Sequence, residues 1–157
     1  MKALAEAFNL PVITTYLHQD VFPCDHDMYC GPLGYLGSKA GMHMIHEADV
    51  VIALGTRLGP FGTNQQYEFD YWPKNAKILQ VDVNPRMLGL TKHADIMVAA
   101  DAKIVSQQLL QALNSMEGNH KNASSQQTRH QLVQKRKAEW AAERIKKENQ
   151  DPQPVDG

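Results

Sequence analysis

The sequence lacks most of the features that assign a protein to a class by themselves. Its 157 residues include only 2 cysteines, too few for the disulfide framework of a small secreted protein. The longest apolar runs, such as residues 50–54, are far too short to cross a bilayer, and no signal peptide follows Met1. With 16 basic and 17 acidic residues, the net charge of −1 creates no field that attracts nucleic acid. We therefore expect a cytoplasmic globular protein with no nucleic-acid partner and no membrane partner.

Motifs that define catalytic centres are also missing. The chain contains no G-x-S-x-G elbow, no H-E-x-x-H pair and no P-loop, so spacing alone predicts no catalytic residue. His18, Cys24, His26 and Cys30 lie in one short segment, which leaves a zinc site as an alternative. Their spacing matches no familiar zinc finger or ribbon, and isolated cysteines more often pack as small hydrophobic side chains. The sequence thus predicts no metal ligands.

The composition changes along the chain. Residues 1–113 alternate apolar runs with Gly and Pro and predict one compact unit. Residues 114–128 are rich in Asn, Ser and Gln, which is typical of a linker. Residues 129–148 predict a solvated helix, because charges of opposite sign recur there at helical spacing. Prolines then end the helical pattern, so residues 149–157 predict a disordered end.

Within the compact unit, apolar runs predict strands and periodic segments predict helices. We expect strands at 11–15, 49–55, 77–83 and 95–100, helices at 2–9, 38–48 and 101–113, and long loops at 16–36 and 56–75. This alternation is typical of an α/β fold with a Rossmann-like parallel sheet and flanking helices. The first helix has no strand before it, so we expect an incomplete domain followed by a helical tail.

A glycine-rich loop provides the first candidate binding residues. Gly34, Gly37 and Ser38 precede a predicted helix, where glycines let backbone N–H groups approach an anionic ligand. The spacing is G-x-x-G-x-x-G rather than the dinucleotide fingerprint G-x-G-x-x-G. The alternative interpretation is that these glycines only serve turn geometry.

Three charged residues complete the candidate site. Arg57 leaves the carboxyl end of a predicted strand and can hold a phosphate or carboxylate, or pair with Asp82 or Asp101. Asp82 can accept hydrogen bonds from ribose hydroxyls, or it can cap the turn that follows it. Asp101 follows the last predicted strand and also caps a helix. We expect these residues and the glycine loop to form one cofactor-binding rim at the carboxyl ends of the strands.

Longer segments of the chain resemble a known family. These segments are residues 14–23, 29–40, 48–63 and 70–78, together with Gln80-Val81-Asp82. They resemble the middle domain of the sulfoacetaldehyde acetyltransferases, which are thiamine diphosphate enzymes of the acetolactate synthase group. The Ala-Asp strand, the Gly-x-Arg loop and the Val-Asp strand are shared across that group. Leu58-Gly59-Pro60-Phe61-Gly62 and Asp70-Tyr71-Trp72-Pro73-Lys74-Asn75 point to the acetyltransferases in particular.

The resemblance implies a function for a longer parent enzyme. In this family three α/β domains follow one another, and the first supplies the glutamate that activates thiamine diphosphate. The third holds Mg²⁺ and the diphosphate through a Gly-Asp-Gly…Asn motif. The middle domain binds FAD in some relatives and mainly organises the subunit in others. The implied reaction converts sulfoacetaldehyde and phosphate to acetyl phosphate and sulfite, in an enzyme expected to be a homo-oligomer.

The chain also departs from the family pattern. It has no Gly-Asp-Gly…Asn segment, no preceding domain and no first strand, and residues 129–148 resemble the linker helix toward the absent cofactor-binding domain. Where FAD-using synthases carry an acidic pair and an arginine, this sequence has Leu58-Gly59-Pro60-Phe61, which argues against flavin. We expect a fragment cut at both ends that is inactive alone and partners the remaining domains. A stand-alone nucleotide- or FAD-binding module and the middle domain of an acetolactate synthase-like enzyme are the alternatives.

Overall fold

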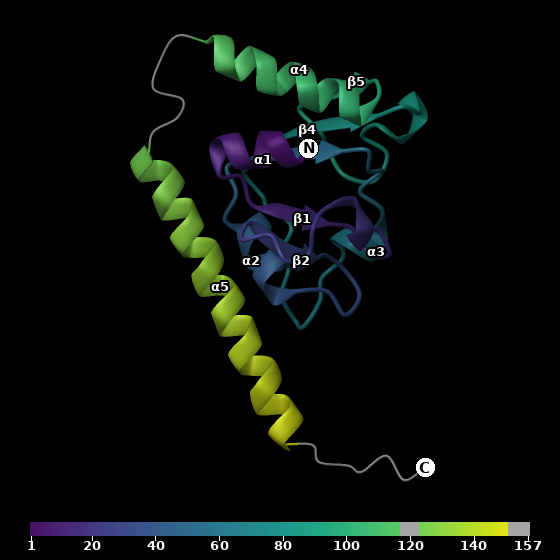
Figure 1. Cartoon of the computed structure of the whole chain (residues 1–157). Coiled ribbons are helices and arrows are strands. Elements are labelled where there is room, and N and C mark those ends of the chain that lie inside the picture. The colour runs from purple at the N-terminus through teal and green to yellow at the C-terminus, as the bar shows by residue number, and fades with distance from the viewer. Residues whose placement is uncertain (117–122, 151–157) are drawn as a thin grey trace.

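The computed structural model describes residues 1–116 and 123–150 (Figure 1). The helices are α1 (Lys2–Phe8), α2 (Lys39–His46), α3 (Pro60–Thr63), α4 (Ala102–Ser115) and α5 (Ala123–Gln150). The strands are β1 (Val12–Thr14), β2 (Tyr29–Pro32), β3 (Val50–Leu54), β4 (Lys77–Asp82) and β5 (Ile96–Ala99). Short 3₁₀ turns lie at η1 (Gln19–Val21) and η2 (Pro85–Met87). The predicted α/β class is confirmed.

The strands form two parallel sheets instead of the single sheet that we expected. β1 pairs with β2, while β3, β4 and β5 form a second sheet in that order. The strand β2 lies inside the segment that we expected to be a long loop. Its sequence contains Gly31 and Pro32, residue types that are depleted in strands, so local propensity did not reveal it. The short helix α3 likewise lies within the second expected loop.

Helix α2 packs against residues of both sheets. Ser38 caps its first turn by accepting a hydrogen bond from the Gly41 N–H at 3.3 Å. Gly41 suits the close packing of this helix, because a Cβ there would lie 3.2 Å from the Cys30 carbonyl oxygen, closer than most such contacts. Met42 and Ile45 then enter a buried cluster on which side chains from both sheets pack. The helix therefore packs closely on β2, and its buried side chains contact residues of both sheets.

Helix α5 is longer and more deeply packed than the predicted tail. It begins at Ala123, inside the expected linker, and ends at Gln150. Helix α4 likewise continues to Ser115, past the predicted start of the linker at residue 114. Residues 117–122 of that linker and residues 151–157 of the expected disordered end lie outside the described residues.

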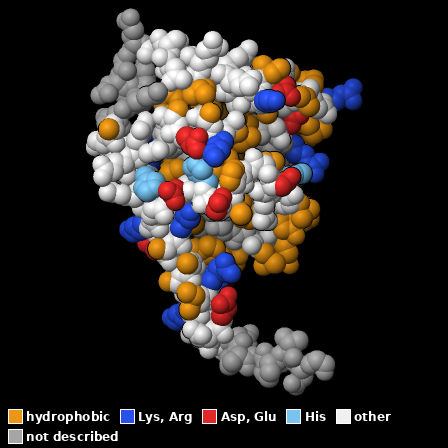
Figure 2. Space-filling model, viewed as in Figure 1, with side chains coloured by type: hydrophobic (Ala, Val, Ile, Leu, Met, Phe, Trp, Pro, Cys, Tyr) orange, Lys and Arg blue, Asp and Glu red, His pale blue; other side chains and the backbone are white. Residues whose placement is uncertain are grey.

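A buried side chain anchors α5 to the rest of the fold. Val133 is 0% exposed and packs with Met28, Cys30 and Met44. Two ion pairs join α5 to the region of α2: Lys39–Glu143 to α2 itself, and Arg136–Glu47 to the residue that follows the last turn of α2. Figure 2 shows basic, acidic and histidine side chains next to one another on the face where α5 crosses the domain. The solvated helix that we expected is therefore solvated on one side only.

None of the described helices has the length and apolar character needed to span a bilayer. The buried side chains instead gather between the sheets and their covering helices, as in a globular α/β domain.

Replacing Val133 with alanine tests whether α5 is part of the folded core. We expect Val133→Ala to lower the free energy of unfolding by about 1–3 kcal/mol, because the change leaves a cavity among tightly packed side chains. Urea unfolding followed by circular dichroism measures this loss. Ile145 is on the same helix but 58% exposed, so Ile145→Ala is the matched control and should change stability by less than about 0.5 kcal/mol. Equal small effects of the two changes would contradict the docking of α5.

Candidate functional site

The carboxyl ends of β3, β4 and β5 meet at one rim, as the sequence predicts. The Gly55 N–H donates to the Val81 carbonyl at 2.8 Å, and the Ala100 N–H donates to the Asp82 carbonyl at 3.1 Å. A Cβ on Gly55 would lie 3.5 Å from the Cβ of Ala102, so the start of α4 is next to the end of β3. Asp82 and Asp101 therefore belong to the same edge of the sheet.

Both aspartates use their carboxylates to organise the local backbone. The Asp82 carboxylate accepts a hydrogen bond from the Asn84 N–H at 2.8 Å. Asp101 caps α4 by accepting from the N–H groups of Lys103 at 2.8 Å and Ile104 at 3.0 Å. These contacts match the capping roles that the sequence left open. A role in cofactor binding stays a prediction for both residues.

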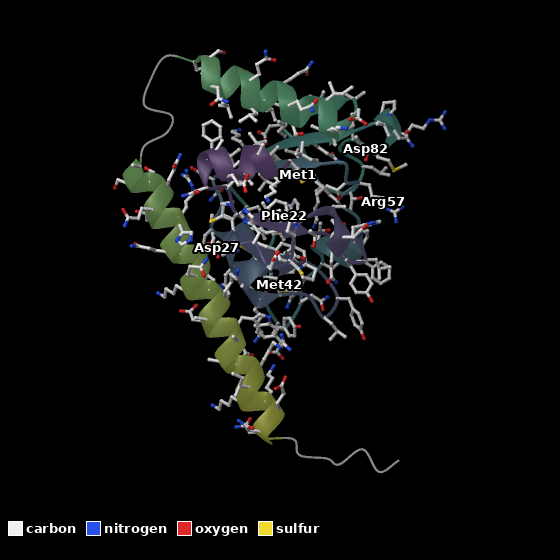
Figure 3. The ribbon with its side chains drawn as sticks, in the orientation of Figure 1. Met1, Phe22, Asp27, Met42, Arg57 and Asp82 are labelled. Carbon is white, nitrogen blue, oxygen red and sulfur yellow. The ribbon has the colours of Figure 1, made fainter. Side chains whose placement is uncertain are left out.

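Arg57 does not form the buried ion pair that we considered. Its side chain is exposed, and within the described residues it makes no salt bridge with Asp82, with Asp101 or with any other carboxylate. Figure 3 shows Arg57 and Asp82 at separate places along one side of the molecule. The structural alternative for Arg57 is therefore wrong. The guanidinium remains open to an anion that arrives from solvent or from another part of a larger protein.

The glycine loop after β2 packs on the loop that contains α3. Gly34 has a φ of +89°, and a Cβ there would lie only 1.7 Å from the Phe61 carbonyl oxygen. That same oxygen accepts a hydrogen bond from the Tyr35 N–H at 3.1 Å. At Gly37 a Cβ would meet the Pro32 carbonyl oxygen at 2.6 Å. Close backbone packing thus explains both glycines, while binding of an anion at this loop stays a prediction.

Tyr71 fills the space beneath the glycine loop. Its side chain is fully buried in the cluster formed with Leu33, Met42 and Ile45. Burial raises the pKa of the Tyr71 hydroxyl to about 12, and the nearby Gly34 backbone opposes the rise. The hydroxyl is therefore protonated at neutral pH and does not serve there as a base.

Gln80 is the residue at the rim that sequence reasoning missed. It is 1% exposed, and its side-chain amide donates to the Thr56 carbonyl at 3.0 Å and to the Met87 carbonyl at 3.3 Å. Its side-chain oxygen accepts from the Gly89 N–H at 2.8 Å. One side chain therefore ties the loop after β3 to the loop after β4. A polar residue in the middle of the apolar Lys77–Asp82 strand was the available signal.

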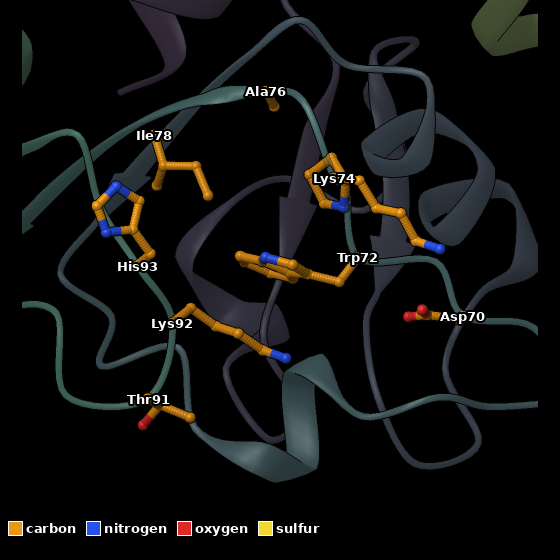
Figure 4. Close-up of a pocket in the computed structure, with 9 residues that line it drawn as sticks. Asp70, Trp72, Lys74, Ala76, Ile78, Thr91, Lys92 and His93 are labelled. Carbon is orange, nitrogen blue, oxygen red and sulfur yellow. The ribbon is translucent and has the colours of Figure 1, made fainter.

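A hollow in the described part of the chain lies away from this rim. It has a volume of about 440 Å³ and is lined by residues before β4 and before β5 (Figure 4). The indole of Trp72 lies at its centre, with the Lys92 Nζ 5.3 Å from the ring centroid. The hollow is thus at the amino ends of the strands, opposite to the edge where parallel sheets usually place ligands.

The four residues of the zinc alternative do not form a metal site. Across the described residues, no group of three His, Cys, Asp or Glu side chains is arranged to hold a metal ion. Cys24 is exposed, whereas Cys30 is buried and its thiol donates to the Met28 carbonyl. Burial raises the pKa of Cys30 to about 12, so the thiol is protonated at neutral pH. Cys30 therefore packs as a small hydrophobic side chain.

Comparison with known proteins gives a consistent set of relatives. The family described as "Thiamine pyrophosphate enzyme, central domain" matches residues 1–113. The sulfoacetaldehyde acetyltransferase of Castellaniella defragrans is 54% identical over 115 residues, which are 73% of this chain and 19% of that protein. The sulfoacetaldehyde acetyltransferase of Roseovarius nubinhibens is 48% identical over 140 residues, 89% of this chain and 23% of that protein.

A second group of relatives is more distant. Acetolactate synthase isozyme 3 large subunit of Escherichia coli is 35% identical over 114 residues, 73% of this chain and 19% of that protein. The chain therefore spans about a fifth of the length of these curated relatives.

Replacing Gln80 tests whether the rim depends on this one buried amide. We expect Gln80→Met to lower the free energy of unfolding by about 2–4 kcal/mol, because it removes three hydrogen bonds and strands their backbone partners. Thermal or urea unfolding measures the change. Arg57→Ala is the matched control at the same rim and should alter stability by less than about 0.5 kcal/mol. A large loss in Arg57→Ala with a small loss in Gln80→Met would contradict this description of the rim.

Proposed function

Because this chain belongs to the family of thiamine pyrophosphate enzyme central domains, we propose that it is the central domain of a sulfoacetaldehyde acetyltransferase. In this proposal the domain organises the subunit and does not supply the catalytic centre. The parent enzyme converts sulfoacetaldehyde and phosphate to acetyl phosphate and sulfite. Its remaining domains are the principal partners of this chain.

The choice of reaction rests on one contrast between the relatives. The two acetyltransferases share 48–54% of residues with the matched part of this chain, against 35% for the acetolactate synthase. Segments such as residues 58–62 and 70–75, which carry the resemblance to acetyltransferases, lie between the strands, the first of them partly in the short helix α3. Connecting segments differ more than strands between functions, so the resemblance there favours the acetyltransferase over the synthase.

Thiamine diphosphate and Mg²⁺ are assigned to the other domains of the parent enzyme. The described residues offer no group of three carboxylate, thiol or imidazole side chains suited to a metal ion. Asp82 and Asp101, the acidic residues at the rim, already accept hydrogen bonds from backbone N–H groups. The side chains that the structure describes therefore do not fit a clamp for a diphosphate and its cation.

An exposed apolar patch supports a role in contacts between domains. It consists of Tyr35, Leu36 and Phe61, and Phe61 is 74% exposed. The backbone bond between Tyr35 and Phe61 brings the two loops together, and hydrophobic side chains gather on one side of the surface in Figure 2. Contiguous apolar surface of this kind marks an interaction site. We assign it, with the exposed Arg57, to the interface with a neighbouring domain of the parent enzyme.

A flavin- or nucleotide-binding role is the second candidate. The observation in its favour is the exposed Arg57 at the strand-end rim, which has the charge to hold a phosphate. Two observations count against this role. The sequence Leu58-Gly59-Pro60-Phe61 stands where FAD-using synthases carry an acidic pair and an arginine, and the carboxylates of Asp82 and Asp101 already accept hydrogen bonds from backbone N–H groups. The cytoplasmic location and the homo-oligomeric state of the parent enzyme stay predictions from the sequence.

A domain exchange tests the proposed function. The matched segment of the Castellaniella defragrans acetyltransferase is replaced by residues 1–113 of this chain, and acetyl phosphate is measured with sulfoacetaldehyde, phosphate, thiamine diphosphate and Mg²⁺. We expect activity within about tenfold of the unaltered enzyme, because the catalytic residues come from the retained domains. This chain alone should give no turnover under the same conditions.

The matched control is the same exchange with the segment of the Escherichia coli acetolactate synthase, which should lower activity further. A soluble, correctly assembled exchange with this chain that is inactive would contradict the proposal, and so would turnover by this chain alone. Flavin that stays bound to the purified chain through gel filtration would favour the second candidate.

A further inference from the structure

A strained turn lies between α2 and α5. Gln66 and Phe69 exchange both backbone hydrogen bonds, at 3.2 and 2.8 Å, so Tyr67 and Glu68 form a two-residue turn between them. Both central residues have a positive φ, +52° for Tyr67 and +60° for Glu68. Glycine, asparagine and aspartate favour such a turn, and neither central position has one of them. Backbone strain of this kind persists only where the surrounding contacts hold it.

Helix α2 holds one side of this turn. The ring of Phe69 lies 4.9 Å, between centroids, from the rings of both His43 and His46. The Lys39 Nζ lies 5.0 Å from the centroid of the Tyr67 ring, which is a cation–π contact. Because Lys39 begins α2 and His46 ends it, the turn is fixed to both ends of this helix.

Helix α5, which runs past α2 in Figure 1, holds the other side of the turn. The centroid of the Trp140 ring lies 5.8 Å from that of Tyr67, and the Lys147 Nζ lies 5.7 Å from the same Tyr67 centroid. Glu143 lies between these two residues of α5 and forms ion pairs with both Lys39 and Lys147. The Tyr67 ring therefore has an aromatic ring and two cations around it, with one cation from each helix.

The hydroxyl of Tyr67 connects the turn to the glycine loop. It donates a hydrogen bond to the Gly37 carbonyl at 3.1 Å. Burial raises the pKa of Tyr67, so the hydroxyl remains a donor at neutral pH. The Gly37 N–H in turn donates to the Gly34 carbonyl at 2.8 Å, and the next residue, Ser38, caps α2. One side chain of the strained turn thus restrains the end of the glycine loop.

The half of α5 that contacts Tyr67 has little buried surface. Val133 is the only buried residue among those of α5 that the structure describes, and it precedes this half. Trp140 and Glu143 are half-buried, and residues 144–150 are exposed. Segments with few buried apolar contacts open locally while the rest of a domain stays folded. This half of α5 therefore has a docked state and an accessible open state.

We propose that Tyr67 is a latch that couples the docking of α5 to the conformation of the glycine loop, residues 34–38. With α5 docked, Trp140 supports the strained turn and the Tyr67 hydroxyl holds Gly37. When α5 opens, the turn loses the contacts on that side and relaxes, so the bond to Gly37 is lost and the loop loosens. The same loop carries part of the apolar patch, whose presentation then depends on α5. The coupling is reciprocal and does not depend on the reaction of the parent enzyme.

Amide hydrogen exchange of the full chain, measured residue by residue, tests the latch. Trp140→Ala removes the contact from α5 and leaves the Tyr67 hydroxyl in place. We expect the amides of Gly37 and Ser38, which donate to carbonyls within the loop and at the end of β2, to exchange about fivefold faster or more. Ile145 is exposed on the same helix, so Ile145→Ala is the matched control and should leave these two amides unchanged.

Reference amides distinguish a local effect from a loss of the whole fold. The Lys77 N–H donates to the Asp49 carbonyl and the Gly55 N–H to the Val81 carbonyl, both at 2.8 Å, at the two ends of the β3–β4 pairing. We expect the exchange of the Lys77 and Gly55 amides in Trp140→Ala to change by less than about twofold.

A double-mutant cycle shows whether α5 acts through the Tyr67 hydroxyl. Tyr67→Phe keeps the ring against Trp140 and deletes the hydrogen bond to Gly37. We expect this single change to accelerate exchange at Gly37, and Trp140→Ala to add little further acceleration in the presence of Tyr67→Phe. Factors that multiply in the double variant would mean that the two side chains act independently, which overturns the proposal.

The remaining outcomes are equally decisive. An unchanged Gly37 amide in folded Trp140→Ala overturns the latch, because α5 then docks independently of the loop. Uniform acceleration that includes the reference amides overturns it as well. If Trp140→Ala does not fold, Trp140→Leu retains an apolar side chain and allows the same comparison. Unfolding of both variants also overturns the proposal, because α5 then has no separate open state.

Discussion

The packing of α2 across both sheets is the contact on which the rest of the structure depends. The two sheets share no described strand pairing, so their relative position follows from the helices that lie over both. Gly41 allows α2 to approach β2 closely, and Met42, with 0% exposure, lies in the cluster reached from β1 and β3. Helix α5 then covers α2 through Val133 and two ion pairs. The buried clusters of the two sheets are linked by shared neighbours, since Ile13 packs on two of them and Val51 on two.

This arrangement is also consistent with the role that we propose for the domain in a larger enzyme. The rim at the ends of β3, β4 and β5 is built mainly from backbone contacts, and its aspartates and Gln80 hold the loops in place. Arg57 is exposed at this rim, and the apolar patch around Phe61 is exposed beside the glycine loop. A domain whose loops are held by hydrogen bonds and whose surface carries an exposed apolar patch is suited to positioning neighbouring domains. That is the role proposed here for a central domain.

The sequence predicted the parts of the fold that depend on local pattern. The strand at Val50–Leu54 and the Asp101 cap of α4 are examples, since an apolar run and a capping side chain are visible in neighbouring residues. Full burial of that strand did not follow, because Val50 is 56% exposed. It did not predict β2, because Gly31 and Pro32 are placed in a strand by pairing with β1 and not by propensity. The burial of Val133 was equally hidden, because only the docking of α5 on a distant segment distinguishes it from the exposed apolar residues of the same helix. At the site, parallel topology was enough to predict that Asp82 and Asp101 lie at the same edge of the sheet. The sequence could not show that Arg57 makes no ion pair among the described residues, because that depends on side-chain geometry.

Native-state hydrogen exchange of Met42→Ala tests the central role of α2 most directly. If α2 holds the two sheets together, the loss of this buried side chain lowers the protection of β1–β2 amides, such as Leu33, and of β3–β4 amides, such as Val81, by the same factor. An equal loss shows that both sheets open together when the helix is weakened. Loss of protection confined to β1 and β2, with the sheet of β3, β4 and β5 unchanged, would contradict the account.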